Sequence, residues 1–120
     1  MTYLYIFIGG GLGSLLRFLI GKLAVRVTRT DFPAGTLITN ILACGLLAIL
    51  VVYAQHREEQ NTWLQPLLIV GFCGGFSTFS TFGHETQVLL GSGNIAYAIA
   101  NVMISVIVGV GLIYFLKLRF

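Results

Sequence analysis

Charge is scarce in this sequence. Only 9 % of its 120 residues are Asp, Glu, Lys or Arg, whereas 57 % are hydrophobic. Soluble domains carry about 25 % charged residues, and seven basic and four acidic side chains cannot cover the outside of such a domain. A soluble globular fold is therefore excluded, and the excess apolar surface is expected to face lipid.

Cysteine is also rare, and the residue groups that enzymes use are missing. Cys44 and Cys73 lie in apolar stretches without metal-ligand spacing, so neither a disulfide nor a zinc site is expected. His84-Glu85 lacks the second His of a metalloprotease helix, and the glycines at 9–13 lack the full dinucleotide fingerprint. No Ser/His/Asp set and no carboxylate pair lies in an apolar block, so we expect no enzyme.

The sequence does contain four long apolar blocks, at residues 4–25, 35–54, 63–90 and 94–118. Each reaches the length of about 20 residues that a helix needs to cross a bilayer, and none alternates as barrel strands do. No basic segment precedes the first block, so we interpret it as a retained span rather than a signal peptide. The sequence predicts an all-α integral membrane protein, with residues 1–120 forming one four-helix transmembrane domain.

Basic residues near the span ends do not favour one orientation. Three are expected on the side of the two termini and three on the opposite side: Arg57, Lys117 and Arg119 against Lys22, Arg26 and Arg29. The positive-inside rule leaves two alternatives. Either the chain inserts both ways and two copies pair antiparallel, or weaker biases select a single orientation.

Polar residues recur three or four positions apart inside the blocks, which places each pair on one helix face. The pairs are Ser14 and Arg17, Thr36 and Asn40, and Asn101 and Ser105. Insertion scales put a central Arg at about +2.5 to +3.5 kcal/mol, so intramembrane polar groups are functional candidates. Interhelical hydrogen bonding explains Ser14 or Asn101 well enough, whereas Asn40 and Arg17 need more partners.

The third block is too long and too rich in glycine for one straight helix. Its 28 residues would span about 42 Å, and adjacent glycines followed by Ser and Thr are poor helix formers. We expect a break within residues 74–80, where carbonyls freed from the helix could bind a cation. Phe76, Phe79 and Phe82 recur every third residue there. Their ring edges could pack in a core or face a dehydrated anion.

Three motifs, in this order, resemble the Fluc/CrcB family of fluoride channels. Residues 9–18 (GGGLGSLLRF) look like the family's first-helix signature, and residues 35–40 (GTLITN) look like its second-helix GTLxxN. Residues 71–82 (GFCGGFSTFSTF) are similar to its third-helix GFxGGxTTFSTF. The third motif is the most specific, and the resemblance covers essentially the whole chain.

The resemblance implies a dual-topology, antiparallel homodimer in the bacterial inner membrane. Its two pores would pass fluoride out of the cytoplasm passively and exclude chloride. Phe79 and Phe82 would line the pore and Asn40 would be a pore donor. A sodium ion at the dimer centre would be held by backbone carbonyls of Gly74 and Ser77.

Further residues are assigned by the same resemblance. Arg17 would lie near an aqueous vestibule. The fluoride path would also be lined by a polar track of hydroxyls and one carboxylate, carried by Thr36, Ser80, Thr81, Ser105 and Glu85.

Two positions depart from the family pattern. Ser77 replaces the first Thr of TTFSTF, which leaves a backbone carbonyl site intact. Gly109 stands one turn beyond Ser105, where members often have a second hydroxyl. This glycine puts the outer part of the polar track in doubt.

Two other classes of protein compete with a channel. A small multidrug-resistance-type exporter of cations, coupled to protons, is also four-spanning, but it needs a central carboxylate. Here the only acidic residue in a span is Glu85, late in the third block, and Arg17 would repel cations. A non-transporting assembly subunit would leave the predicted break without a purpose.

Overall fold

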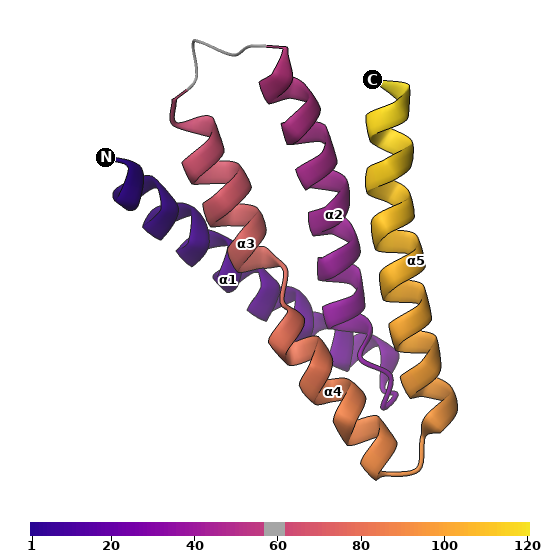
Figure 1. The fold of residues 1–120 in the computed structure, drawn as a ribbon. Helices are drawn as coiled ribbons and strands as arrows, with labels where there is room; N and C mark the ends of the chain where they lie inside the picture. Colours follow the sequence, from indigo (N-terminus) through magenta and orange to yellow (C-terminus); the bar gives the residue numbers. More distant parts are fainter. Residues whose placement is uncertain (57–61) are drawn as a thin grey trace.

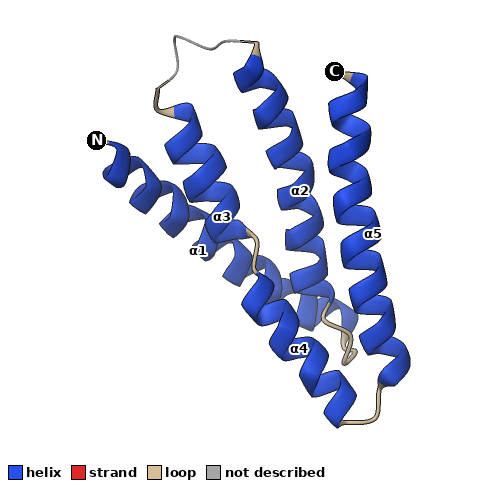
Figure 2. Ribbon diagram, in the orientation of Figure 1, coloured by secondary structure: helices blue, strands red, loops and turns tan. Residues whose placement is uncertain are grey.

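The computed structural model describes residues 1–56 and 62–120, and over these residues all regular structure is helical (Figure 2). Its elements are α1 (Thr2–Thr28), α2 (Ala34–Gln55), η1 (Gln65–Cys73), α3 (Gly74–Phe76), α4 (Phe79–Gly91) and α5 (Ile95–Arg119). η1 has wider, π-type turns and leads directly into α3. Four segments are long and apolar enough to cross a bilayer, which confirms the prediction of a multi-pass, all-α membrane protein.

The four spans alternate in direction along the chain (Figure 1). α1 and the third span, made of η1, α3 and α4, run away from the end that holds both termini, and α2 and α5 return toward it. The α4–α5 connection is short because Gly93 adopts φ +85°, a left-handed conformation that glycine enters without steric cost. Arg57, which entered the charge balance, lies outside the described residues.

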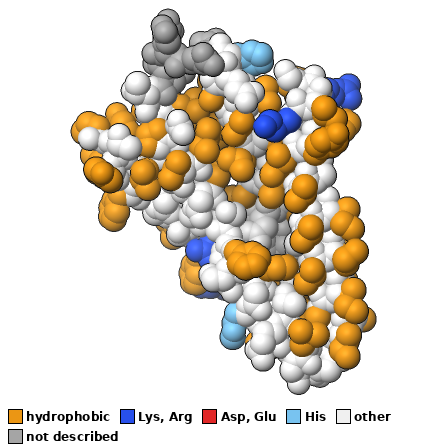
Figure 3. Space-filling model, viewed as in Figure 1, with side chains coloured by type: hydrophobic (Ala, Val, Ile, Leu, Met, Phe, Trp, Pro, Cys, Tyr) orange, Lys and Arg blue, Asp and Glu red, His pale blue; other side chains and the backbone are white. Residues whose placement is uncertain are grey.

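Burial in this chain is the reverse of that in a soluble protein. The largest fully buried side chains are polar, Asn101 and Thr39, both 0 % exposed. Large apolar side chains are exposed along every span, and orange hydrophobic atoms cover much of the face in Figure 3, where charged groups appear at few points. A surface with so many exposed apolar side chains is unfavourable in water, so it is suited to contact with lipid and protein partners.

Glycines let α1 pack directly against the backbone of the third span. A methyl group added at Gly9 would overlap the Leu67 carbonyl oxygen, and one at Gly13 would overlap that of Phe72. From the other side, a methyl group at Gly75 would overlap the Gly10 carbonyl oxygen. Small residues spaced four apart permit such close approach of membrane helices. The first half of the third span is therefore fixed on α1.

The helical path of the third span is interrupted between α3 and α4. α3 ends at Phe76, and the next two residues are extended, with ψ 158° at Ser77 and ψ 121° at Thr78. Helical geometry resumes at Phe79. This stretch lies within the glycine- and hydroxyl-rich segment of residues 74–80. Two residues of extended backbone at this depth need hydrogen-bond partners from elsewhere in the protein.

Candidate functional site

Asn40 supplies partners for the interrupted backbone. Its Nδ2 donates to the Thr78 carbonyl oxygen at 3.1 Å, and its Oδ1 accepts from the Thr78 backbone N–H at 2.8 Å. A side-chain amide has a carbonyl oxygen and, on the same side, one of its two N–H groups, so it can bond the N–H and the C=O of one residue. Asn40 of α2 therefore pairs with both polar groups of Thr78. Among the described residues, the second N–H of this amide has no acceptor.

This pairing changes the hydrogen bonding of two carbonyls, those of Gly74 and Ser77. In a continuous helix, the amide four residues later donates to each carbonyl. Here the Thr78 amide donates to Asn40 instead, and the Thr81 amide donates to the Thr78 hydroxyl at 3.2 Å. The carbonyls of Gly74 and Ser77 thus lack their helical donors. Unwound carbonyls at membrane depth suit a hard cation such as sodium, so these two fit the role that the resemblance implies.

The carbonyl between them is used differently. Gly75 O accepts from Arg17 Nε at 3.0 Å and from Ser14 Oγ at 3.4 Å. Both donors come from α1, on the face that the glycines bring close to the third span. Arg17 therefore secures the backbone beside the interruption as well as carrying a positive charge.

The Thr78 hydroxyl begins the second half of the span. It accepts from the Thr81 amide as the N-cap of α4 and lies 3.2 Å from Thr81 Oγ1 and 3.3 Å from Ser80 Oγ. Hydroxyls at this position satisfy one of the free N–H groups at a helix start. Thr78 was not among the candidate site residues predicted from the sequence. The signal was present, because a Thr preceding a new helical segment is a typical N-cap.

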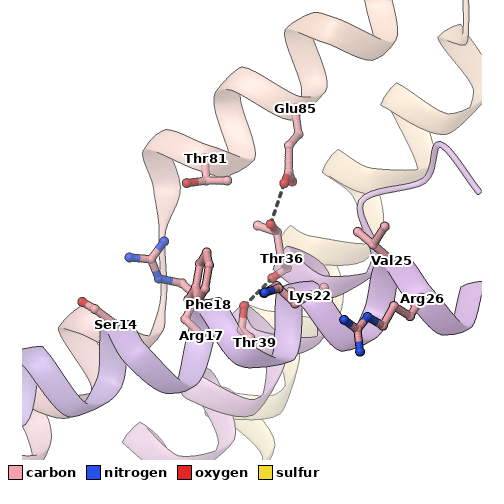
Figure 4. Close-up of a pocket in the computed structure, with 12 residues that line it drawn as sticks. Ser14, Arg17, Phe18, Lys22, Val25, Arg26, Thr36, Thr39, Thr81 and Glu85 are labelled. Carbon is pink, nitrogen blue, oxygen red and sulfur yellow. Dashed lines mark hydrogen bonds between the residues drawn. The ribbon is translucent and has the colours of Figure 1, made fainter.

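A cavity of about 750 Å³ lies between α1, α2 and α4 (Figure 4). Among the described residues that line it, the basic ones are Arg17, Lys22 and Arg26, and the acidic one is Glu85. Clefts lined by one sign of charge raise the local concentration of ions of the opposite sign. This cavity is suited to collecting anions and Arg17 lines it, while the place of Arg17 near an aqueous vestibule stays a prediction.

Glu85 enters this cavity from α4 and is held by α2. Its Oε1 accepts from Thr36 Oγ1 at 2.8 Å, while Oε2 is buried without a hydrogen-bond partner among the described residues. Thr36 in turn offers its backbone carbonyl to the Thr39 hydroxyl at 3.0 Å (Figure 4). The structure thus brings together Thr36, Thr81 and Glu85 of the predicted polar track.

A second cavity, of about 300 Å³, is lined by four more of the predicted pore residues, Asn40, Phe79, Phe82 and Ser105. The rings of Phe79 and Phe82 lie 5.7 Å apart at a tilt of 41°. Phe79 is 83 % exposed in the single chain. In a membrane, so exposed a ring is covered by lipid or by a protein partner.

Residues at the start of α4 contribute to the lining of both cavities. Thr78 lines the smaller cavity and Thr81 the larger, and their hydroxyls are bonded to each other. Ser80 is bonded to this pair but is exposed and lines neither cavity. The predicted track residues are therefore divided between two spaces, which are joined by a short chain of hydroxyls.

A separate contact fixes α4 to α5. Asn101 Nδ2 donates to Thr86 Oγ1 at 3.1 Å, and Thr86 Oγ1 donates to the Phe82 carbonyl oxygen at 2.8 Å. Asn101 therefore acts as an interhelical hydrogen-bonding residue, one of the two interpretations its position allowed. Thr86 was not singled out in the sequence.

These features define a class: a multi-pass membrane protein with an interrupted span, a basic cavity and polar groups buried at the interruption. The family described as CrcB-like protein, Camphor Resistance (CrcB), matches residues 4–116. The chain therefore belongs to the CrcB family, as its three motifs predicted.

Curated relatives match along most of their length, and each is named fluoride-specific ion channel FluC. The relative from Flavobacterium psychrophilum is 39 % identical over 90 % of this chain and 87 % of its own length. The one from Solibacter usitatus is 35 % identical over 96 % and 94 %, respectively. The one from Paracoccus denitrificans is 42 % identical over 88 % and 83 %.

Proposed function

We propose that this protein is a fluoride-selective ion channel that lets fluoride leave the cytoplasm passively across the bacterial inner membrane. The observation that carries the proposal is the grouping of Asn40, Phe79, Phe82 and Ser105 around one cavity beside the interruption of the third span. The names of the curated relatives support the same function.

The geometry suggests how fluoride would pass. The basic cavity at Arg17 attracts anions from water by long-range electrostatics. The hydroxyls of Thr78 and Thr81 connect this cavity to the smaller one, where the free N–H of Asn40 and the positive ring edges of the phenylalanines replace hydration. Partial charges bind the ion weakly enough for release, as conduction requires.

Assembly as an antiparallel homodimer belongs to the same proposal. The balanced basic residues permit insertion in both orientations, and the exposed Phe79 ring offers an apolar surface for a second copy to contact. A second copy would cover it and bring together two sets of Gly74 and Ser77 carbonyls, which would hold a sodium ion at the centre. The interruption at Ser77 and Thr78 then has a structural purpose.

The decisive experiment measures fluoride release from liposomes. Purified protein is reconstituted with internal potassium fluoride or potassium chloride, valinomycin is added, and each halide is followed with its selective electrode. Rapid fluoride release without chloride release supports the proposal. Folded protein that releases no fluoride rejects it.

A matched pair of phenylalanine variants tests the pore. Phe79→Ile removes the ring edge from the cavity, and release is expected to fall by about tenfold or more, because an aliphatic surface offers no positive edge to the anion. Phe7→Ile is the control, since Phe7 is similarly exposed at 79 % but lies on α1, away from the cavity. Equal effects of the two changes would point to lipid contact instead.

Glu85→Gln separates the channel from the exporter. The substitution keeps the oxygen that accepts from Thr36 but removes the charge, so a channel still releases fluoride. A proton-coupled exporter needs a titrating carboxylate and would stop.

Replacing sodium by a bulky organic cation during purification tests the cation site, because lost sodium is expected to weaken the dimer on size-exclusion chromatography.

A further inference from the structure

The cavity beside Phe79 contains a side chain that belongs to none of the three motifs and to no part of the proposed track. Cys44 lies four residues, about one helical turn, beyond Asn40 on α2, and both residues line the cavity of about 300 Å³. The thiol is only half-buried. The other cysteine, Cys73, is 4 % exposed and does not line this cavity.

The Cys44 thiol lies against Gly109 of α5. Gly109 is buried on α5 and lines the same cavity, and a methyl group added to it would lie 3.3 Å from Cys44 Sγ. The sulfur therefore occupies the space that a side chain at position 109 would take. At this level of the cavity, α2 rather than α5 supplies the polar atom.

A second observation concerns the polar groups on the wall of this cavity. The Ser105 hydroxyl lies one turn before Gly109 on the cavity wall and is buried without a hydrogen-bond partner among the described residues. Buried polar atoms in native proteins nearly always have a partner, and none of the described residues supplies one to this hydroxyl. Asn40, with one N–H still free, faces the same space.

We propose that Cys44 is a pore-lining residue of this chain, whose thiol takes the place of the hydroxyl absent at position 109. The proposal rests on the fluoride-channel function above. A thiol is a weak donor with a polarisable sulfur, so it contacts a passing anion without holding it. A reagent that modifies the Cys44 sulfur would therefore block the pore.

Methyl methanethiosulfonate, a small uncharged reagent, tests the proposal. It transfers a methylthio group to the thiolate, forming a mixed disulfide and releasing methanesulfinate. Liposomes with the dimer are treated, fluoride release is compared with untreated liposomes, and mass spectrometry identifies the modified cysteine. We expect modification at Cys44 and a fall in release of about fivefold or more, because the added group narrows the path.

Two single variants assign the effect. Cys73→Ala should remain sensitive to the reagent, whereas Cys44→Ser should lose the sensitivity, each judged by the ratio of its treated to its untreated release. Full release from protein shown to be modified at Cys44 would overturn the proposal, as would a Cys44 that stays unmodified. Wild-type protein that releases no fluoride before treatment would instead reject the function itself, and the pore-lining role with it.

An exchange of side chains between the two helices gives a test without reagent. Gly109→Ser alone should slow release about two- to fivefold, because its Cβ meets the sulfur at 3.3 Å and crowding displaces pore groups. Adding Cys44→Ala removes the obstruction and returns a hydroxyl to position 109, so release should recover. If the double variant is as slow as Gly109→Ser, the two positions do not share this space and the proposal is wrong.

Discussion

The two halves of the third span are held by different kinds of contact. η1 and α3 lie directly on α1, and methyl groups at Gly9, Gly13 or Gly75 would overlap backbone atoms. α4 has no such contact: a methyl group at Gly83 would meet nothing within 4 Å. Its attachments include side-chain hydrogen bonds to α2 and α5 and the packing of the buried Leu89.

The two halves therefore have different roles, one structural and one in lining the cavities. The backbone-packed half has no room for rearrangement and provides a fixed reference for the interruption. The other half carries Phe79, Phe82, Thr81 and Glu85, which line the cavities. Side chains anchored by single hydrogen bonds at this depth contribute about 0.6 kcal/mol each on average, so α4 is the half that substitutions can tune.

The largest effect is expected from disrupting the packing of η1 and α3 against α1. Gly13→Ala places a methyl group against the Phe72 carbonyl oxygen and 2.7 Å from Phe76 N. Neither atom can move without shifting a helix, so we expect a loss of about 1–3 kcal/mol or more in the free energy of unfolding. Thermal unfolding in detergent measures it. Gly11→Ala on the same helix is the control, because its added methyl group meets nothing within 4 Å; equal destabilisation by both would refute the packing argument.

The next largest effect is expected from removing the hydrogen bonds between Asn40 and Thr78, at the junction of the two halves. Asn40→Leu keeps the approximate volume but leaves the Thr78 N–H and carbonyl without partners, at about 1–3 kcal/mol for each unsatisfied group. We expect fluoride release to fall at least about tenfold and the unfolding temperature to drop. Release and unfolding are measured on the same preparation. Wild-type values for both would show that the Asn40–Thr78 pair is dispensable.

A smaller effect is expected at Arg17, which touches the packed half but also faces the basic cavity. Arg17→Lys keeps the charge but loses the planar group that donates to Gly75 O, so we expect a loss of about 1 kcal/mol in stability with partial fluoride release. Arg17→Gln removes the charge as well and should lower release further. If Arg17→Lys has wild-type stability, the Gly75 contact contributes nothing and the charge alone matters.

The smallest effect is expected for the hydrogen bond that joins α4 to α5. A double-mutant cycle of Asn101→Leu and Thr86→Val isolates the bond between these side chains, and the coupling energy should be about 0.6 kcal/mol. Unfolding of the four proteins gives this value. A coupling of several kcal/mol would contradict the view that α4 is loosely attached.

The sequence predicted the four spans because long apolar runs leave no other stable arrangement in lipid. It also marked residues 74–80 as poor helix, and the extended residues Ser77 and Thr78 lie there. The motifs predicted which polar residues gather at the site. The motif carrying Asn40 and the one carrying Phe79 do meet at one cavity.

Pairings between helices could not be read from the sequence. Periodicity assigns a residue to a helix face but does not set the rotation of that helix against its neighbours. The division of the track between two cavities, the partnership of Thr86 with Asn101, and the contact between Cys44 and Gly109 all depend on that rotation. Thr78 was missed for another reason, since its role comes from its backbone as much as from its side chain.

The pairing of Asn40 with Thr78 also bears on how the chain enters the membrane during synthesis. The third span is the least apolar of the four, and its interruption would present bare peptide groups to lipid if it emerged alone. α2 leaves the ribosome first, so the complementary amide is already in place when residues 77 and 78 arrive. Biogenesis therefore depends on the order of these two spans, and a rearranged gene that delays α2 should yield a third segment that fails to integrate.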